Sequence, residues 1–95
     1  MLLGNKIKSL RDEQEVLQRQ LAAYLEIDTP MFSKIERGDR RAKRSQVILL
    51  AKYFNVDEKE MLKLWLADKV LDAVGDEEEC ELKIDAIEVA KETIL

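Results

Sequence analysis

The sequence predicts an all-α fold, in which a bundle of five short helices is followed by a C-terminal helical extension. The 95 residues include only three glycines and one proline, so few positions favour the frequent turns of a β protein. Apolar residues recur at every third or fourth position in successive segments, which is the spacing of amphipathic helices. Hydrophobic residues make up 46% of the chain and aromatic residues 5%, so we expect a mainly aliphatic core.

The first two helices are predicted by this spacing. Leu3, Ile7 and Leu10 follow an i, i+4, i+7 pattern, which indicates a helix over residues 2–13. A short linker follows, and residues 17–25 resume the pattern as a second helix. The apolar positions of that second helix are Leu17, Leu21 and Leu25, and we expect Val16 and Leu17 to lead into the core.

A third helix is predicted between Asp28 and Gly38. Asp28 is a good N-cap because its carboxylate can accept hydrogen bonds from the free N–H groups of the first turn. Pro30 lies in that first turn, where a missing N–H is harmless, and Gly38 suits the left-handed residue that ends many helices. Two short helices joined by a turn of about four residues match the helix-turn-helix arrangement, whose second helix enters the DNA major groove. The expected buried side of this helix is Met31, Phe32 and Ile35.

Three more helices complete the prediction. Residues 45–54 have helical spacing, with Ser45, Arg44 and Lys43 as alternative starting points. A long helix begins near Asp57 and ends at Gly75, and it is apolar on so many sides that it must be buried on more than one. Residues 82–94 form the last helix. We expect residues 1–67 to be the globular domain and residues 68–95 the extension. The expected inward positions of the fourth helix are Val47, Leu50, Ala51 and Phe54.

Charge is distributed unevenly along the chain. Residues 1–53 hold 11 basic and 7 acidic residues, whereas residues 54–95 hold 5 basic and 13 acidic residues. The net charge of −4 is therefore the sum of a basic half and a more strongly acidic half. Because the basic residues gather beside the third predicted helix, we expect that end of the molecule to meet phosphates.

Several positions follow the pattern of one known family. They are Gln18, Leu21 and Ala22, Ile27, the Ile35-Glu36-x-Gly38 ending, and Leu50 with Ala51. Through these positions, residues 4–66 resemble the lambda-repressor-like, Cro/C1-type family of bacterial and phage regulators. The resemblance implies the five-helix order of that family and DNA as the partner. Two positions depart from the family pattern: Glu26 replaces the usual glycine of the turn, which implies a positive φ, and Arg37 replaces the usual asparagine.

DNA readers of this type separate phosphate contacts, which fix position, from base-edge contacts, which carry sequence. Because Phe32 and Ile35 are expected to point inward, the remaining side chains of the third helix should face the groove. The expected base contacts are Thr29, Pro30, Ser33 and Lys34. The expected phosphate contacts are Gln18, Arg37, Arg40, Arg41, Lys43 and Arg44. Glu36 is interpreted as structural, because a carboxylate facing phosphates would repel them.

The extension is predicted to hold two copies of the chain together. Its apolar surface exceeds what a five-helix core can use, and helix-turn-helix proteins usually place two copies about one DNA turn apart. The alternative is a monomer whose extension covers its own core. The expected dimer-interface residues are Trp65, Leu66, Val70, Leu71, Ile84, Ile87 and Ile94.

Catalysis and cofactors are not expected. The chain has no histidine, and Cys80 is its single cysteine, so the usual groups of nucleophilic and general-base catalysis are missing. The acidic run at 76–81 lacks the spacing of a calcium loop, and we expect no metal. No apolar run approaches the ~18 residues of a membrane span, and no signal-like pattern opens the sequence, so a cytoplasmic location is expected.

Together these features predict a sequence-specific DNA-binding transcriptional regulator, most simply a repressor that binds a pseudo-palindromic operator as a homodimer. One alternative is an antitoxin-like protein-interaction module whose acidic C-terminal region binds a partner protein. Another is a controller protein of a restriction–modification operon. The helical pattern of residues 77–94 favours self-association over the disordered tail that antitoxins often carry.

Overall fold

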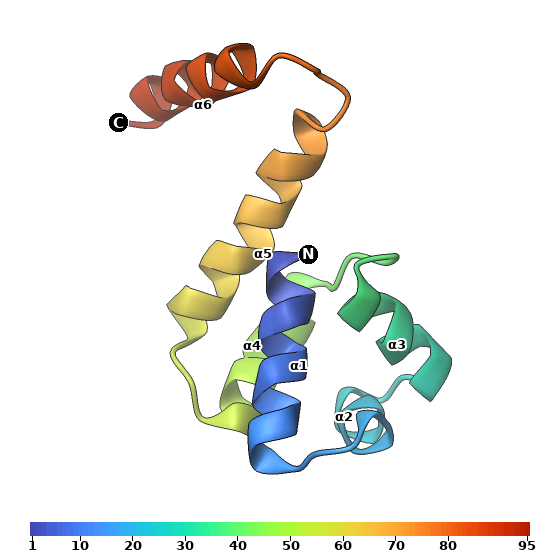
Figure 1. Ribbon diagram of the computed structural model, residues 1–95. Helices are drawn as coiled ribbons and strands as arrows, with labels where there is room; N and C mark the ends of the chain where they lie inside the picture. The colour runs from blue at the N-terminus through green and yellow to red at the C-terminus, as the bar shows by residue number, and fades with distance from the viewer.

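A computed structural model describes residues 1–95, and it is all-helical, as the sequence predicted. Helices α1 to α4 and the first half of α5 form a globular body. The second half of α5 projects from the body on one side, contacts the body through Asp68 and Asp72 on the other, and leads through a turn to α6 (Figure 1). The helices are α1 Leu2–Gln14, α2 Gln18–Leu25, α3 Thr29–Arg37, α4 Arg44–Phe54, α5 Glu58–Ala73 and α6 Cys80–Ile94.

The core is a single aliphatic cluster that the apolar stripes of five helices share. The predicted inward positions of α1 and α4 are all buried, and so are Leu21 and Leu25 of α2. Phe32 of α3 is a large side chain with no exposed surface, so its truncation would cost about 3–5 kcal/mol. Helices α2 and α3 pack against each other, and α1 and α4 pack against α5. This packing fixes the position of α3 within the body.

Two local expectations were wrong, and one open alternative is decided. Leu17 has an extended backbone and precedes α2 as its N-cap, and its side chain is half exposed instead of buried in the core. The Gln20 side chain, which accepts a hydrogen bond from the Leu17 N–H at 2.7 Å, favours this start. Met31 is only half-buried and lies outside the core cluster. Of the three alternative starting points of the fourth helix, the structure selects Arg44 as the first residue of α4 and Lys43 as its N-cap, and Ser45 does not cap the helix.

The expected turn geometry is present on both sides of α3. Glu26 has a φ of 59°, so it adopts the left-handed conformation for which the related regulators use glycine. Gly38 has a φ of 83° and ends α3. The Asp28 carboxylate accepts a hydrogen bond from the Met31 N–H at 2.7 Å, which confirms Asp28 as the N-cap.

Gly4 is a glycine that the sequence did not single out, although the packing of α1 on α3 depends on it. A Cβ atom at this position would lie 2.0 Å from the carbonyl oxygen of Glu36. The backbones of α1 and α3 therefore approach more closely than any other residue would allow, and a larger side chain would push α3 away from α1.

A buried ion pair joins the same two helices. The Arg11 guanidinium donates two hydrogen bonds to the Glu36 carboxylate, from Nε at 2.7 Å and from Nη2 at 2.8 Å. The two side chains are 14% and 7% exposed. The hydrogen bond to Glu36 raises the pKa of Arg11 above its usual value. Arg11 also donates to the Val16 carbonyl at 3.1 Å, so the pair fixes the link between α1 and α2 as well. Glu36 therefore has the structural role expected of it.

Helix α5 holds the N-terminus of α1 and the loop after α3. The N–H groups of Leu2 and Leu3 donate to the two carboxylate oxygens of buried Asp68, at 2.9 and 3.0 Å. A carboxylate is favourable there because it meets the positive end of the α1 dipole. The Trp65 indole N–H donates to the Ala42 carbonyl at 2.7 Å. Helix α5 runs through the expected domain boundary at residue 67 without a break.

The extension leaves most of its apolar surface uncovered. No residue of α6 is buried. Of the thirteen large hydrophobic side chains that are exposed, nine lie in the second half of α5 and in α6 or beside it. The extension therefore does not cover the core of its own chain. These nine are Leu66, Val70, Leu71, Leu82, Ile84, Ile87, Val89, Ile94 and Leu95.

We expect Glu36→Ala to destabilise the body, because it leaves the largely buried Arg11 guanidinium without its carboxylate. The free energy of unfolding should fall by about 2–3 kcal/mol, less than for a fully buried pair because Arg11 keeps some contact with water. Urea denaturation followed by circular dichroism measures this. Glu60→Ala, which breaks the exposed pair with Lys63, is the matched control and should change nothing measurable. Equal losses in the two variants would contradict the role given to Glu36.

Candidate nucleic-acid interface

The outward face of α3 is open to solvent over its N-terminal half. Thr29, Pro30 and Lys34 are exposed, and Ser33 is half-buried. The face is held in place from the other side, because Phe32 and Ile35 are buried in the core. The side chains expected to contact bases are therefore presented by a helix whose orientation is fixed by packing.

Ser33 and Arg37 are joined along this face. The Ser33 hydroxyl accepts a hydrogen bond from Arg37 Nη1 at 3.2 Å, and Arg37 Nε donates to Asp39 at 3.1 Å. Arg37 thus lies along the end of α3, with part of its charge balanced by a carboxylate. The Ser33 hydroxyl hydrogen remains available for donation to another acceptor.

Gln18 lies at the start of α2 and is connected to α3 through Glu36. Its amide nitrogen donates to a Glu36 oxygen at 3.2 Å, which leaves its carbonyl oxygen and second N–H free. No side chain caps the first N–H groups of α2, so they remain available next to the Gln18 side chain. An anion placed there would meet these N–H groups and the positive end of the helix dipole.

The segment from Gly38 to Arg44 carries four exposed basic side chains on an anchored backbone. Asp39 and Arg40 both donate their N–H groups to the Lys34 carbonyl, at 2.8 and 3.2 Å, and Ala42 is buried. Trp65 holds the Ala42 carbonyl from α5. The loop is therefore a fixed platform for its charges. The exposed basic side chains are Arg40, Arg41, Lys43 and Arg44.

These basic side chains differ in their partners. Arg41 forms an ion pair with Asp72 of α5, and the two side chains are 38% and 52% exposed. No carboxylate lies within ion-pair distance of Arg40, Lys43 or Arg44. The sequence pattern did not indicate a role for Asp72, because 31 residues separate it from its partner. Arg11 was likewise not singled out as the partner of Glu36.

The residues expected at a dimer interface fall into two groups. Trp65 is half-buried against its own core, donates to Ala42, and carries the Lys69 ammonium 3.6 Å from its ring centroid. Trp65 therefore stabilises the globular body of its own chain. The other six are exposed on the projecting part of α5 and on α6. They are Leu66, Val70, Leu71, Ile84, Ile87 and Ile94.

Comparison with known proteins agrees with this geometry. A family model described as helix-turn-helix matches residues 7–61, which extend from α1 into the start of α5. No curated protein and no solved structure matches the chain. No helix of the structure combines the length and the apolar character needed to cross a membrane. The chain belongs to the lambda-repressor-like, Cro/C1-type helix-turn-helix family, and it is a DNA-binding transcriptional regulator.

Proposed function

We propose that this regulator is a sequence-specific repressor that binds a pseudo-palindromic operator as a homodimer. The observation that carries the proposal is the outward face of α3, which is exposed and polar while its opposite face is locked into the core. A rigid helix with free polar side chains is what direct reading of base edges requires.

Within this proposal, the exposed side chains of α3 read the major groove. The Thr29 hydroxyl can donate or accept, and its methyl group can pack against the methyl group of thymine. Lys34 can donate to the O6 and N7 acceptors of guanine. Pro30 and Ser33 complete the face as an apolar contact and a short hydroxyl group. Each of these contacts requires the groove to meet the N-terminal half of α3.

Phosphate binding falls to two sites beside α3. At one, Gln18 and the first N–H groups of α2 receive a phosphate. At the other, the basic residues of the loop and the start of α4 hold the backbone, and Arg40, Lys43 and Arg44 are free to do so without breaking an ion pair. Arg37 and Arg41 are paired with Asp39 and Asp72, so they bind phosphates only where a phosphate displaces the carboxylate.

Dimeric binding follows from the size of the site. A single α3 helix reads a short half-site, and two copies about one DNA turn apart add their contacts. The acidic α6 lies beyond α5, on a part of the molecule separate from α3 (Figure 1). Repression follows where the operator overlaps a promoter, because a bound dimer excludes polymerase from the same DNA.

A second candidate function comes from the exposed apolar surface of α6. An antitoxin-like module would bind a partner protein there, and a controller protein of a restriction–modification operon would regulate neighbouring genes from the same fold. Purification of the chain together with the products of its adjacent genes distinguishes these roles. A stable complex with a neighbouring gene product would favour the antitoxin-like role.

We expect Thr29→Ala and Lys34→Ala each to weaken binding to the best duplex from in vitro selection by about 1–3 kcal/mol, because each loses a base-edge contact. Preference at one or two base pairs should relax as well. Fluorescence anisotropy measures both effects. Binding to a random duplex is the control and should fall much less. Equal losses on the selected and random duplexes would assign these residues to phosphate contacts.

We expect Arg40→Ala to weaken binding to selected and random duplexes alike, because it removes a phosphate contact that carries no sequence information. The slope of log affinity against log salt concentration should flatten by about 0.9. Lys63→Ala on the first half of α5 is the charge-matched control and should leave the slope unchanged. An unchanged slope in Arg40→Ala would show that Arg40 is only a solvated surface residue.

The Asp72 carboxylate should compete with DNA phosphates for Arg41. We therefore expect Asp72→Asn to raise affinity for a random duplex a few-fold at low salt, since the freed guanidinium gains a phosphate. The decisive control is the same change in an Arg41→Ala background, where the gain should disappear. If the gain persists without Arg41, Asp72 acts only through general repulsion of DNA.

A further inference from the structure

Helix α6 has an unusual distribution of charge around its circumference. Its four acidic residues are spaced i, i+4, i+7 and i+11, so they form one narrow stripe along the helix. Apart from two lysines, the rest of the circumference is almost entirely apolar or small. A helix with such a wide apolar surface requires burial on more than one side. The acidic stripe consists of Glu81, Asp85, Glu88 and Glu92.

The apolar surface of α6 divides into two adjoining faces. Ile87, Ala90 and Ile94 lie on one face. Together with Val70 of α5, Leu95 and the stem of Lys91, they line an open groove of about 230 Å³. Leu82 and Val89 lie on the other face, outside that groove, and they are 49% and 63% exposed. The chain's own α5 therefore approaches one face only, and the second face has no partner within the chain.

Helix α6 also lacks the contacts that would stabilise it in a single chain. An isolated helix of 15 residues is marginal in water, and α6 has no side-chain N-cap and no buried residue. The nine exposed aliphatic side chains between Leu66 and Leu95 are 37–93% exposed. They are the apolar surface that an association through this part of the chain would bury.

We propose that both apolar faces of α6 are enclosed in a four-helix bundle, formed by α5 and α6 of one chain with α5 and α6 of a second copy. This proposal rests on the dimeric binding proposed above and names how the two copies meet. The groove face packs between its own α5 and the partner, and the Leu82 and Val89 face packs on the partner alone. The two copies use the same surfaces, which closes the assembly with two-fold symmetry.

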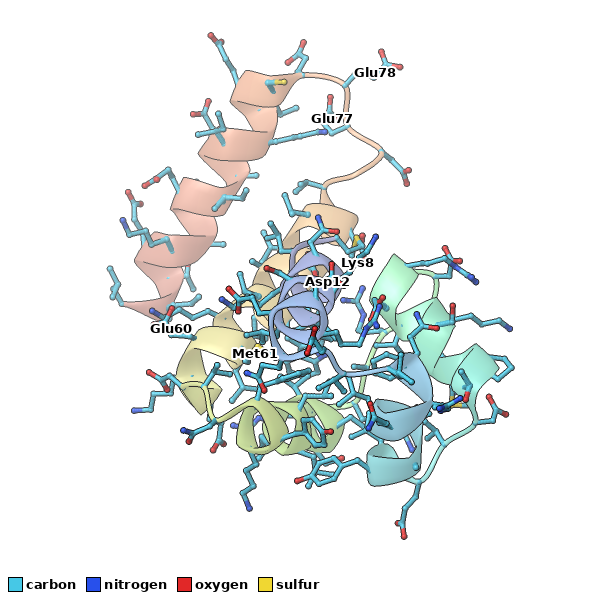
Figure 2. All side chains as sticks on the ribbon, turned by 60° about the horizontal axis from the view of Figure 1, so that its bottom comes forward. Lys8, Asp12, Glu60, Met61, Glu77 and Glu78 are labelled. Carbon is cyan, nitrogen blue, oxygen red and sulfur yellow. The ribbon has the colours of Figure 1, made fainter.

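The position of the charges favours a second copy over a basic foreign protein. In the bundle, the acidic stripe stays in water along the outer edge, where the two chains repel each other least. Glu77 and Glu78 lie in the connection between α5 and α6, away from the globular body (Figure 2). A basic partner would instead have to cover the acidic stripe, and the apolar faces that need burial lie elsewhere on the helix.

The test is sedimentation equilibrium of the full chain without DNA, over micromolar concentrations. We expect a dimer, and we expect Val89→Asp and Ile87→Asp each to weaken it at least about 100-fold, because every dimer would bury two such charges. Glu88→Lys on the acidic stripe is the control and should leave the dimer intact or strengthen it. Thermal unfolding checks that the body stays folded, which the absence of buried residues in α6 leads us to expect.

Three results would overturn the proposal. The first is a full-length chain that stays monomeric. The second is a dimer that Ile87→Asp disrupts and Val89→Asp does not, which indicates a single helical seam in place of an enclosed helix. The third is a Glu88→Lys variant that is monomeric while Ile87→Asp and Val89→Asp remain dimeric. Binding of the variants to a random duplex is measured separately. If a monomeric variant still binds DNA with the same dependence on salt, the proposed DNA binding stands even where the proposed bundle fails.

Discussion

The Glu36 carboxylate is the contact on which the helix-turn-helix part of the structure depends. It lies at the end of α3, receives two hydrogen bonds from Arg11 of α1, and receives a third from Gln18 of α2. Three helices therefore meet at one charged group that is almost excluded from water. Gly4 allows this arrangement, because it lets the backbones of α1 and α3 touch at the same residue.

Helix α5 connects the helix-turn-helix part of the body to the extension. Three of its residues hold other segments: Trp65 the loop after α3, Asp68 the first turn of α1, and Asp72 the Arg41 side chain. The same helix continues outward as the apolar surface that leads to α6 (Figure 1). One helix therefore contacts both the basic loop and the extension.

Much of the fold was predictable because it depends on local rules. The buried positions of α1 and α4 follow from helical spacing, the Asp28 cap from its side-chain chemistry, and the left-handed turns from Glu26 and Gly38. Leu17 and Met31 were misjudged because spacing gives the face of a helix but neither its first residue nor the depth of its burial. The base and phosphate contacts stay predictions: packing sets the outward orientation of these side chains on α3 and the loop, whereas contact depends on how DNA docks against them.

The sequence by itself determined the helices, the order of their apolar stripes, the basic loop and the acidic extension, because each depends on neighbouring residues and on composition. Only the tertiary structure decided which distant residues meet. Arg11 pairs with Glu36 across 25 residues and Arg41 with Asp72 across 31, and Asp68 reaches the first turn of α1 from 65 residues away. Such contacts depend on the angles at which helices cross, which local spacing does not specify. The same packing left α6 without a partner in its own chain.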